Sequence, residues 1–362
     1  MRLFQSDNFS QSEIRYAGIS PPPFLAGILA NYFDSYEVKR VFRLDRPEIN
    51  SENYRVILRA GGKSLNILLR RYKNLSDLDQ IFFYLSLLDD LIKLKVLVSP
   101  AIINLAGKPA TKIGKNIFTL FKFIEGEYFS PTREAFASAA RAIAEMHAGF
   151  NRLEPEKASK INFVSKQTGA YYNKIKKYSG ADFNGIARII ENKKIKTAID
   201  KEVLKNRRRF VDIAAGVNGS QDKIQSLPKQ IIHSDLHPHN LLFEGGEVRA
   251  ILDFDAVRIS EQARDVAFAI YRFGRQFLIN KSANEAKILA PMLRESFLKN
   301  YYSVKGFSTA EIDLMPVLLK DEFTRKLLFV LKSVYLENNL TWSKDLPKFI
   351  AAFEEIDYFW PD

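Results

Sequence analysis

Residues 231–255 contain the side chains in this chain that are best suited to chemistry. The segment reads IIHSDLHPHNLLFEGGEVRAILDFD and holds His233, Asp235, Asn240 and Asp253 at a spacing that phosphoryl transfer needs. Transfer of the terminal phosphoryl group of ATP requires positioning, Mg²⁺ to neutralise charge, and a carboxylate that accepts the proton of the attacking hydroxyl. Asp235 is the candidate for that carboxylate. Asn240 and Asp253 offer the hard oxygen ligands that Mg²⁺ prefers.

These side chains must be positioned by a loop and a β-hairpin. Residues 241–243 predict one strand, 244–247 a tight turn with two glycines, and 248–252 the returning strand. The returning strand ends directly before Asp253. The hairpin is therefore expected to bring this carboxylate back alongside Asn240.

The same segment resembles the Brenner motif of the aminoglycoside phosphotransferase and choline kinase superfamily, the small-molecule branch of the protein-kinase-like fold. Its loop has the length of the kinase pattern H-R-D-L-x-x-x-N, with Ser234 in place of the arginine. By this resemblance Asp235 is the catalytic base and His233 shapes the loop. Asn240 and Asp253 would then hold Mg²⁺.

Two further motifs extend the resemblance downstream. The run ILDFDA at residues 251–256 resembles the family's metal motif, which implies that Asp255 helps to order the metal site. The run RDVA at residues 264–267 resembles the family's D-L-A. This second motif implies that Asp265 braces the catalytic loop and takes no part in the chemistry.

The resemblance implies an α+β, two-lobed protein-kinase-like fold, with a small β-rich N-lobe that has one main helix and a larger, mainly helical C-lobe. The apolar patterns agree with that order. They predict N-lobe strands and one helix at residues 36–44, 53–59, 64–71, 75–94 (the helix) and 115–124. We expect a leader at residues 1–35, which includes a short amphipathic helix, a nucleotide-binding N-lobe at 36–124 and a C-lobe at 125–362.

Several N-lobe residues are expected to bind ATP, although the pattern departs from the family there. Residues 68–73, LLRRYK, align with the family's V-L-K-L-Y-R and place Arg70 where a lysine usually holds the phosphates. Arginine can hold phosphates in a bidentate way that lysine cannot. The family's glycine turn is replaced by residues 47–53, from which Ser51 and Asn53 are candidates for phosphate contacts.

Two other positions of the nucleotide site follow from the resemblance. The run FKFIEG at residues 121–126 resembles the family's connection between the lobes, which implies that the backbone near Lys122 and Ile124 meets adenine. The glutamate that usually pairs with the phosphate-binding lysine is replaced by Asp79 or Gln80.

Composition limits the class of protein. The chain has 362 residues, 46% of them hydrophobic and 12% aromatic, which suits a globular enzyme. It has no cysteine, which excludes disulfides, thiolate catalysis and cysteine-based zinc sites. No apolar run is long enough for a transmembrane helix, and the N-terminus lacks the apolar core of a signal peptide. A cytoplasmic location is therefore expected.

The histidines offer one alternative metal chemistry. An iron site made of two histidines and a carboxylate could use His233, Asp235 and a third histidine. However, His237 and His239 share one short loop, and His147 ends a predicted helix. We expect His147 to be a packed or capping residue.

The acceptor is indicated by the distribution of charge. Of the formal net charge of +12, residues 151–230 contribute +10, from 18 lysines and arginines against eight aspartates and glutamates. Such a field repels polycations such as aminoglycosides, so a neutral or anionic hydroxyl compound, such as a sugar or a hydroxy amino acid, is expected. The alternative is that these charges are solvated helix faces. No nucleic-acid-binding motif appears, so a nucleic-acid partner is not expected.

The preferred hypothesis is an ATP-dependent and Mg²⁺-dependent kinase that phosphorylates a hydroxyl of a small molecule. One alternative is a protein kinase on the same fold, against which the short interval from Asp253 to Asp265 argues, because it leaves little room for an activation segment. The other is an inert binding module, which Arg70 and the missing glycine turn motivate. The choice between ATP and GTP, the acceptor and the oligomeric state stay open.

Overall fold

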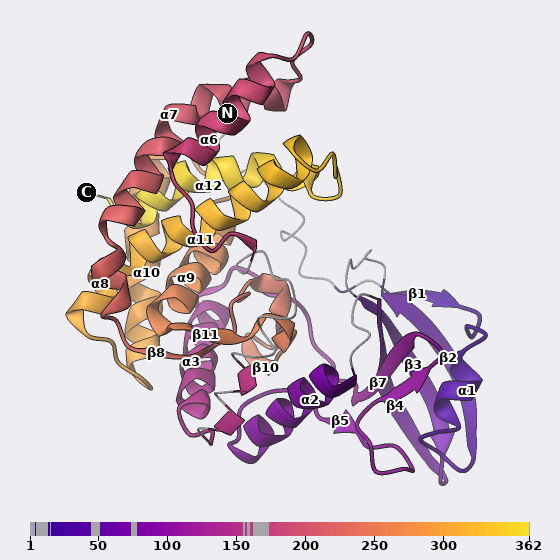
Figure 1. The fold of residues 1–362 in the computed structure, drawn as a ribbon. Coiled ribbons are helices and arrows are strands. Elements are labelled where there is room, and N and C mark those ends of the chain that lie inside the picture. The colour runs from indigo at the N-terminus through magenta and orange to yellow at the C-terminus, as the bar shows by residue number, and fades with distance from the viewer. Residues whose placement is uncertain are drawn as a thin grey trace. The chain divides into compact units, whose positions relative to one another are not determined.

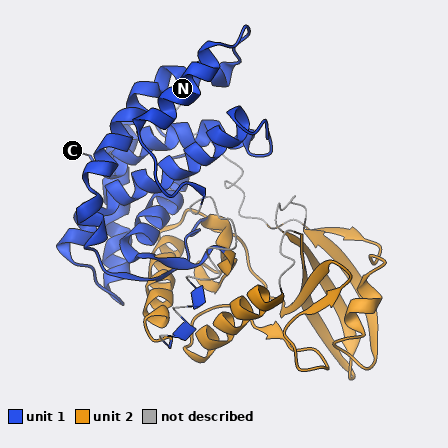
Figure 2. Cartoon of the chain, in the orientation of Figure 1, with its two compact units in different colours: residues 1–7, 154–237, 256–362 blue, residues 8–153, 238–255 orange. Residues whose placement is uncertain are grey.

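The structure is a computed structural model that describes residues 4, 14, 16–44, 51–73, 78–154, 156–157, 160–161 and 174–361. Its contacts divide the chain into two compact units, coloured separately in Figure 2. Unit 1 comprises residues 1–7, 154–237 and 256–362, and unit 2 comprises residues 8–153 and 238–255. Each unit therefore joins segments that lie far apart in the sequence. The expected lobe boundaries after residues 35 and 124 stay a prediction.

Unit 2 is built on an antiparallel sheet with the strand order β1-β2-β3-β4-β7-β5, in which β6 also pairs with β7. The strands are β1 (Tyr16–Ile19), β2 (Tyr36–Leu44), β3 (Ser51–Ala60), β4 (Lys63–Tyr72), β5 (Ala101–Ile102), β6 (Thr111–Ile113) and β7 (Asn116–Lys122) (Figure 1). The four strands predicted from the apolar pattern are confirmed as β2, β3, β4 and β7. The structure adds β1, β5 and β6, which are short and carry little alternation.

The β3–β4 hairpin sets the register on which the nucleotide site depends. Its turn consists of Gly61 and Gly62, with φ values of +55° and +75°. Glycine adopts these left-handed values without steric cost, and such two-residue turns match the twist of the strands. The resulting register places Asn53 opposite Arg70. Two candidate phosphate-binding residues thus become neighbours across the sheet.

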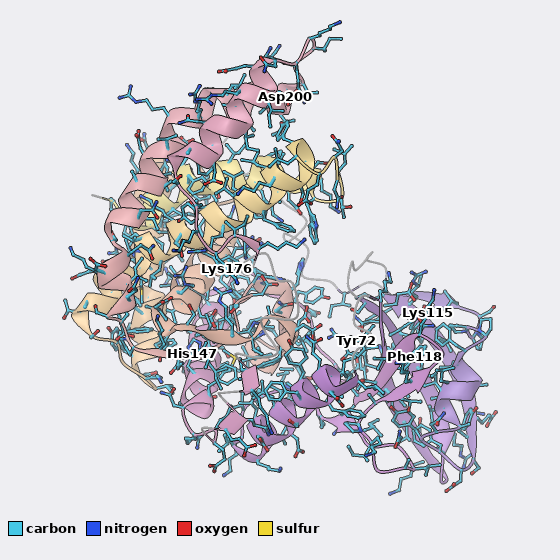
Figure 3. All side chains as sticks on the ribbon, in the orientation of Figure 1. Tyr72, Lys115, Phe118, His147, Lys176 and Asp200 are labelled. Atoms are coloured by element: carbon cyan, nitrogen blue, oxygen red, sulfur yellow. The ribbon has the colours of Figure 1, made fainter. Side chains whose placement is uncertain are left out.

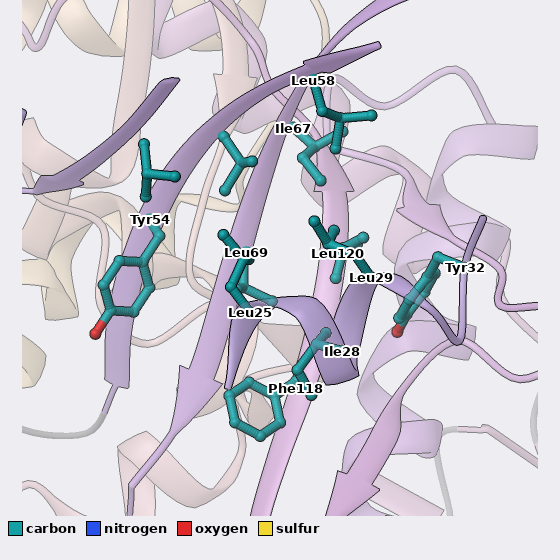
Figure 4. Packing of buried hydrophobic residues seen from close by; sticks show 12 residues of the cluster. Leu25, Ile28, Leu29, Tyr32, Tyr54, Leu58, Ile67, Leu69, Phe118 and Leu120 are labelled. Atoms are coloured by element: carbon teal, nitrogen blue, oxygen red, sulfur yellow. The ribbon is translucent and has the colours of Figure 1, made fainter. Parts of the chain in front are cut away.

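One face of this sheet carries a hydrophobic core that α1 (Leu25–Leu29) covers (Figure 4). Successive side chains of a strand point to opposite faces of the sheet, so every second residue faces this core. The strand residues on the core face are almost fully buried and include Val56, Leu58, Ile67, Leu69 and Leu120. Leu25, Ile28 and Leu29 are each at most 1% exposed. Residues 16–29 lie within the expected leader at 1–35 and supply β1 and α1 to unit 2, where the apolar side chains of α1 fill the core. The short helix expected in this segment is thus present as α1.

Two helices and a hairpin complete unit 2. They are α2 (Leu78–Lys93), α3 (Arg133–Phe150) and the strands β9 (Leu241–Glu244) and β10 (Glu247–Ile251). Thr132 caps the N-terminus of α3, because its side-chain hydroxyl accepts a hydrogen bond from the Ala135 N–H at 3.2 Å. His147 lies on α3 and is fully buried, as expected for a packed histidine (Figure 3).

The β9–β10 hairpin belongs to unit 2 although unit 1 segments flank it in sequence. Its turn uses Gly245 and Gly246 at φ +57° and +85°, as the predicted turn requires. Glu127 and Phe243 exchange two backbone hydrogen bonds of 2.8 Å. These contacts fix the hairpin against the segment that follows β7.

Unit 1 is mainly helical. Its helices are α6 (Gly180–Glu191), α7 (Ala198–Gly219), α8 (Gln221–Gln225), α9 (Gln262–Leu278), α10 (Ala283–Tyr302), α11 (Thr309–Tyr335) and α12 (Leu346–Phe359), and β8 (Lys229–Ile232) pairs antiparallel with β11 (Arg258–Glu261). Among the helices that the structure describes here, four begin with a capping box, at Ser179, Thr197, Ser282 and Ser308. In the described part of the chain, no helix has the length and apolar character needed to cross a membrane.

Candidate active site

The loop that carries Asp235 begins where β8 ends, in unit 1. The backbone N–H groups of His233 and Ser234 donate to the two carboxylate oxygens of Asp265, at 2.7 and 2.8 Å. Asp265 is 1% exposed and lies in the first turn of α9. Ser234 has a φ of +72°, a left-handed value that is rare for residues other than glycine. Asp265 thus braces this strained turn, as the resemblance of residues 264–267 implies.

His233 supports the loop from within. It is fully buried, and its Nδ1 accepts from the backbone N–H of Asp235 at 3.3 Å. This contact orients the backbone on which the candidate base stands. The geometry agrees with a shaping role for His233, which stays a prediction.

The Asp235 carboxylate lies among groups that favour its ionised form. Its side chain is 39% exposed, and its oxygens lie 3.4 Å from His237 Nε2 and 3.8 Å from Lys326 Nζ. Burial acts to raise the pKa of Asp235, but His237, Lys326 and His233 more than offset this and hold the pKa well below its usual range. Asp235 is therefore a carboxylate at neutral pH. A weak base of this kind orients a hydroxyl and takes up its proton only as the new bond forms.

Unit 2 contains a pocket of about 1070 Å³, counting the space at its open side. Its polar lining brings together most of the residues predicted for nucleotide and metal binding: Asn53, Arg70, Lys122, Asn240, Asp253 and Asp255. Its apolar lining includes Leu68, Phe121, Ile124, Leu242, Ile251 and Leu252. A pocket with apolar walls and a few convergent polar groups is the usual form of a small-molecule site.

The guanidinium of Arg70 lies beside two carboxylates of this pocket. Its Nε donates to Asn53 Oδ1 at 3.3 Å, and its Nη1 lies 3.5 Å from Asp253 Oδ1 and 4.0 Å from Asp255 Oδ2. The Arg70 side chain is 15% exposed, whereas those of Asp253 and Asp255 are 41% and 30% exposed. A guanidinium beside two carboxylates is thus presented to the pocket, where phosphate oxygens and a divalent cation could replace these contacts.

The hairpin brings Asn240 and Asp253 together as the sequence predicted. The Asn240 carbonyl accepts from the Leu252 N–H at 2.8 Å, so Asp253 follows directly in the pocket. Asp253 has a φ of +62°, and such strained residues concentrate at functional sites. Among the described residues, no three His, Cys, Asp or Glu side chains form a metal-binding group. Two carboxylates and an amide oxygen suit Mg²⁺, which keeps waters and takes further ligands from phosphates.

The backbone at the expected adenine site is partly occupied by other contacts. The Lys122 N–H donates to the Pro100 carbonyl at 3.1 Å, and the Lys122 carbonyl accepts from Ser99 Oγ at 2.8 Å. The Phe123 N–H donates to the Asn66 carbonyl at 3.1 Å. Ile124 lines the pocket just beyond these contacts, so its N–H is the better placed of the two predicted backbone positions.

Ser51 and the expected phosphate turn are placed differently from Asn53. Ser51 is 6% exposed, pairs with Tyr72 at the start of β3, and is not among the described residues that line the pocket. Residues 47–50 of the expected turn lie outside the described residues. Gln80, one of the two candidates for the position of the usual glutamate, is buried and donates to the Tyr84 hydroxyl at 3.4 Å.

Sequence reasoning did not predict three residues for this site: Tyr128, His239 and Lys326. His239 and Tyr128 line the pocket with ring centroids 4.4 Å apart. Lys326 approaches Asp235 from the middle of α11. The signal for Lys326 is its position directly before the apolar run LLFVL, because a lysine on the buried face of a helix needs a partner.

Comparison with known proteins agrees with this geometry. The model of the phosphotransferase enzyme family matches residues 44–286. A homoserine kinase from Brucella anthropi is 32% identical over 104 residues, which cover 28% of this chain and 29% of that protein. A homoserine kinase from Chelativorans sp. is 25% identical over 289 residues, covering 77% and 76%. The match to the Brucella proteins thus spans less than a third of their length.

Solved structures share the fold at low identity. An aminoglycoside phosphotransferase from Alicyclobacillus acidocaldarius has a TM-score of 0.62 at 14% identity, covering 94% of this chain and 95% of that one. A spectinomycin phosphotransferase, in complex with ADP and spectinomycin, has a TM-score of 0.59 at 14% identity, covering 92% and 95%. These structures confirm the protein-kinase-like α+β fold that was expected from the sequence.

Proposed function

Because the chain belongs to the phosphotransferase enzyme family, we propose that it transfers the terminal phosphoryl group of ATP to a hydroxyl of a small molecule. One observation carries the proposal: Arg70, Asp253 and Asp255 converge in a pocket with apolar walls. Phosphoryl transfer depends on positioning and on the neutralisation of charge, and these groups supply both.

The pocket is the proposed nucleotide site. Adenine would lie between apolar walls such as Leu68 and Ile251 and accept a hydrogen bond from the Ile124 N–H. Arg70 would bind phosphate oxygens, and Asn53 orients its guanidinium at 3.3 Å. The spectinomycin phosphotransferase of the same fold is in complex with ADP, which supports a nucleotide as a ligand of this chain.

Asn240, Asp253 and Asp255 would hold Mg²⁺. The donor set fits, because all three side chains offer hard oxygens and line the same pocket. When bound, Mg²⁺ neutralises charge that develops on the phosphate oxygens. The carboxylates of Asp253 and Asp255 now face Arg70, so the arginine keeps them oriented toward the pocket.

Asp235 is the proposed base. It orients the acceptor hydroxyl and accepts its proton while the hydroxyl oxygen forms a bond to the terminal phosphorus. The bond from that phosphorus to the bridging oxygen of ADP breaks in the same step, and ADP leaves with the electron pair. Because the pKa of Asp235 lies below its usual range, the residue is a carboxylate at neutral pH and can accept the proton.

The acceptor is proposed to be a hydroxy amino acid, and homoserine is the first compound to assay. Proteins named homoserine kinase match this chain over as much as 81% of its length, and the basic segment at residues 151–230 disfavours polycations. A protein substrate is disfavoured by the short interval after Asp253. A 3₁₀ turn (Phe254–Ala256), β11 and the start of α9 fill this interval.

The test combines turnover with nucleotide binding. Asp235→Asn is expected to lower kcat by roughly 10²- to 10⁴-fold, the usual contribution of a general base, while the rise in melting temperature caused by ATP and Mg²⁺ is retained. Asp253→Asn is expected to lose the Mg²⁺-dependent part of that rise. Asp222→Asn, on the exposed side of α8, is the matched control for the loss of one acidic charge. A near-normal rate in Asp235→Asn would contradict the mechanism.

A further inference from the structure

Unit 1 holds three cationic side chains that act on one another, here called the cationic cluster: Arg272 on α9, Lys326 on α11 and Lys348 on α12. Arg272 is 6% exposed, and the side chains of Lys326 and Lys348 are 11% and 31% exposed. Lysine and arginine are seldom buried to this degree. The three residues come from different helices, so the fold brings them together and no local sequence motif does.

One aromatic ring organises the two most buried members. The Phe268 ring centroid lies 4.1 Å from Lys326 Nζ and 5.8 Å from Arg272 Cζ. Phe268 is 3% exposed, so its ring is a fixed support for both cations. Lys326 Nζ also lies 3.8 Å from Asp235 Oδ1. One member of the cationic cluster, Lys326, therefore lies within ion-pair distance of the candidate base.

Like charges in the cationic cluster repel one another. Burial lowers the pKa of Lys326, and the charges of Arg272 and Arg258 lower it further, against the effect of Glu322 and Asp235. Burial also lowers the pKa of Lys348, followed by the charge of Arg272. This repulsion destabilises the free protein, and an anion bound among the cations would relieve it.

Besides Asp235, two carboxylates of unit 1 contact members of the cationic cluster, and Glu322 is shared with arginines outside it. Glu322 lies 3.0 Å from Arg258, 3.7 Å from Arg264 and 3.7 Å from Lys326. Asp345 lies 2.8 Å from Lys348 at the start of α12. An incoming anion would therefore add to an arrangement in which each carboxylate is shared or lies at the margin.

We propose that the cationic cluster binds the carboxylate of the acceptor, so that the enzyme phosphorylates hydroxy acids and discriminates against neutral alcohols. The proposal rests on the proposed function, because it assigns the acceptor of the same reaction. A carboxylate fits better than a phosphate, since Asp235 at 3.8 Å from Lys326 repels a dianion more strongly than a monoanion. Lys326 links the two sites, because it contacts the base and faces the bound anion.

Matched pairs of acceptors that differ only by a carboxylate test the proposal. L-homoserine is paired with 3-aminopropan-1-ol, glycerate with ethylene glycol, and 4-hydroxybutyrate with propan-1-ol. ADP release is measured for each, with glycerol 1-phosphate as a phosphorylated comparison. In at least one pair the acid is expected to have a kcat/KM about 10- to 100-fold above that of its partner without the carboxylate, as for loss of a charged hydrogen bond. Equal values within every pair, or a preference for glycerol 1-phosphate, would overturn the proposal.

Lys348→Gln separates binding of the acid from an effect on the phosphoryl group. This variant is expected to raise the KM of the preferred acid about tenfold and to lower the acid-to-alcohol ratio of kcat/KM by the same factor, with little change in the KM for ATP. Lys344→Gln, an exposed lysine four residues earlier, is the matched control. A fall in kcat that is equal for both members of a pair, with an unchanged ratio, would assign the cluster to the phosphoryl group instead.

A binding measurement distinguishes failure of this proposal from failure of the proposed function. The melting temperature is followed with each acid and with its partner without the carboxylate at matched ionic strength, in the absence of nucleotide. A rise with an acid that Lys348→Gln abolishes, but no ADP release, would support the anion site and refute the kinase reaction. ADP release without any preference for the acid would refute the anion site and leave the kinase reaction standing. No rise with any acid and no ADP release would refute both.

Discussion

The brace between Asp265 and the catalytic loop predicts a large effect from a small substitution. Asp265→Asn keeps the size of the side chain, but its amide can accept only one of the two hydrogen bonds now made by the N–H groups of His233 and Ser234. The second N–H would face an NH₂ group. A hydrogen bond to a charged group contributes roughly 1.5–3 kcal/mol, and a buried donor left without an acceptor adds to the loss. We expect unit 1 to lose about 3 kcal/mol.

Tryptophan fluorescence reports on this unit selectively. The two tryptophans of the chain, Trp342 and Trp360, both belong to unit 1. For a unit of about 200 residues, a loss of about 3 kcal/mol lowers the melting temperature by roughly 6–12 °C. The same variant is expected to lower kcat and to leave the KM for ATP unchanged, since the nucleotide pocket lies in unit 2.

A second substitution in the same turn is expected to behave differently. Ser234→Gly removes a side chain from a residue at φ +72°, and glycine adopts this value freely. Its gain is offset by the greater freedom of glycine in the unfolded chain, so the unfolding free energy should stay within about 1 kcal/mol. If Asp265→Asn melts within 2 °C of the wild type and keeps its kcat, the brace does not hold the loop and the reasoning is refuted.

Two further substitutions test the packing. Gly126→Ala would place a Cβ 2.9 Å from the carbonyl oxygen of Phe243. This contact should destabilise unit 2 by roughly 1–3 kcal/mol, measured by urea unfolding monitored by tyrosine absorbance. The control is Gly185→Ala on α6, where a Cβ would have no neighbour within 4 Å, so this variant should not be destabilised. Burial acts to raise the pKa of Asp200. Hydrogen bonds from Lys193 and other donors more than offset this effect and lower the pKa to about 2. A depressed pKa stabilises the fold above the unfolded pKa, so Asp200→Asn should cost about 1–2 kcal/mol at pH 7, allowing for screening. By tryptophan fluorescence this difference should fall away between about pH 4 and pH 2, and an equal loss at both ends would contradict the pKa argument.

Regular alternation made most of the sheet predictable. In β3 and β4 the buried positions alternate and a Gly-Gly turn joins the strands, so each signal supports the other. The strand β1 (Tyr16–Ile19) has no such pattern, because it pairs only at the edge with β2. The short helix expected after Pro21, Pro22 and Pro23 is present as α1, which begins at Leu25.

The residues of the candidate site also fall into those that the sequence predicted and those that it did not. Asp235, Asn240 and Asp253 were readable because one loop and one hairpin carry them within a short span. Arg272 and Lys348 were not readable, because each lies on a separate helix and meets the other only through the packing of α9, α11 and α12. The pairing of Lys122 with Pro100 and Ser99 was equally hidden, since β5 has only two residues.

Unit 2 is made of two separate segments of the chain, residues 8–153 and 238–255, and this has a consequence for folding during synthesis. Phe129 packs on Phe243 with ring centroids 5.6 Å apart and is 2% exposed. The ribosome makes roughly 80 residues between the two halves of this unit, which takes about 4–16 s at 5–20 residues per second. During that interval the nascent first half presents Phe129 and its neighbours to solvent or to a chaperone. Residues 8–153 expressed alone would keep this apolar surface permanently and would be prone to aggregate.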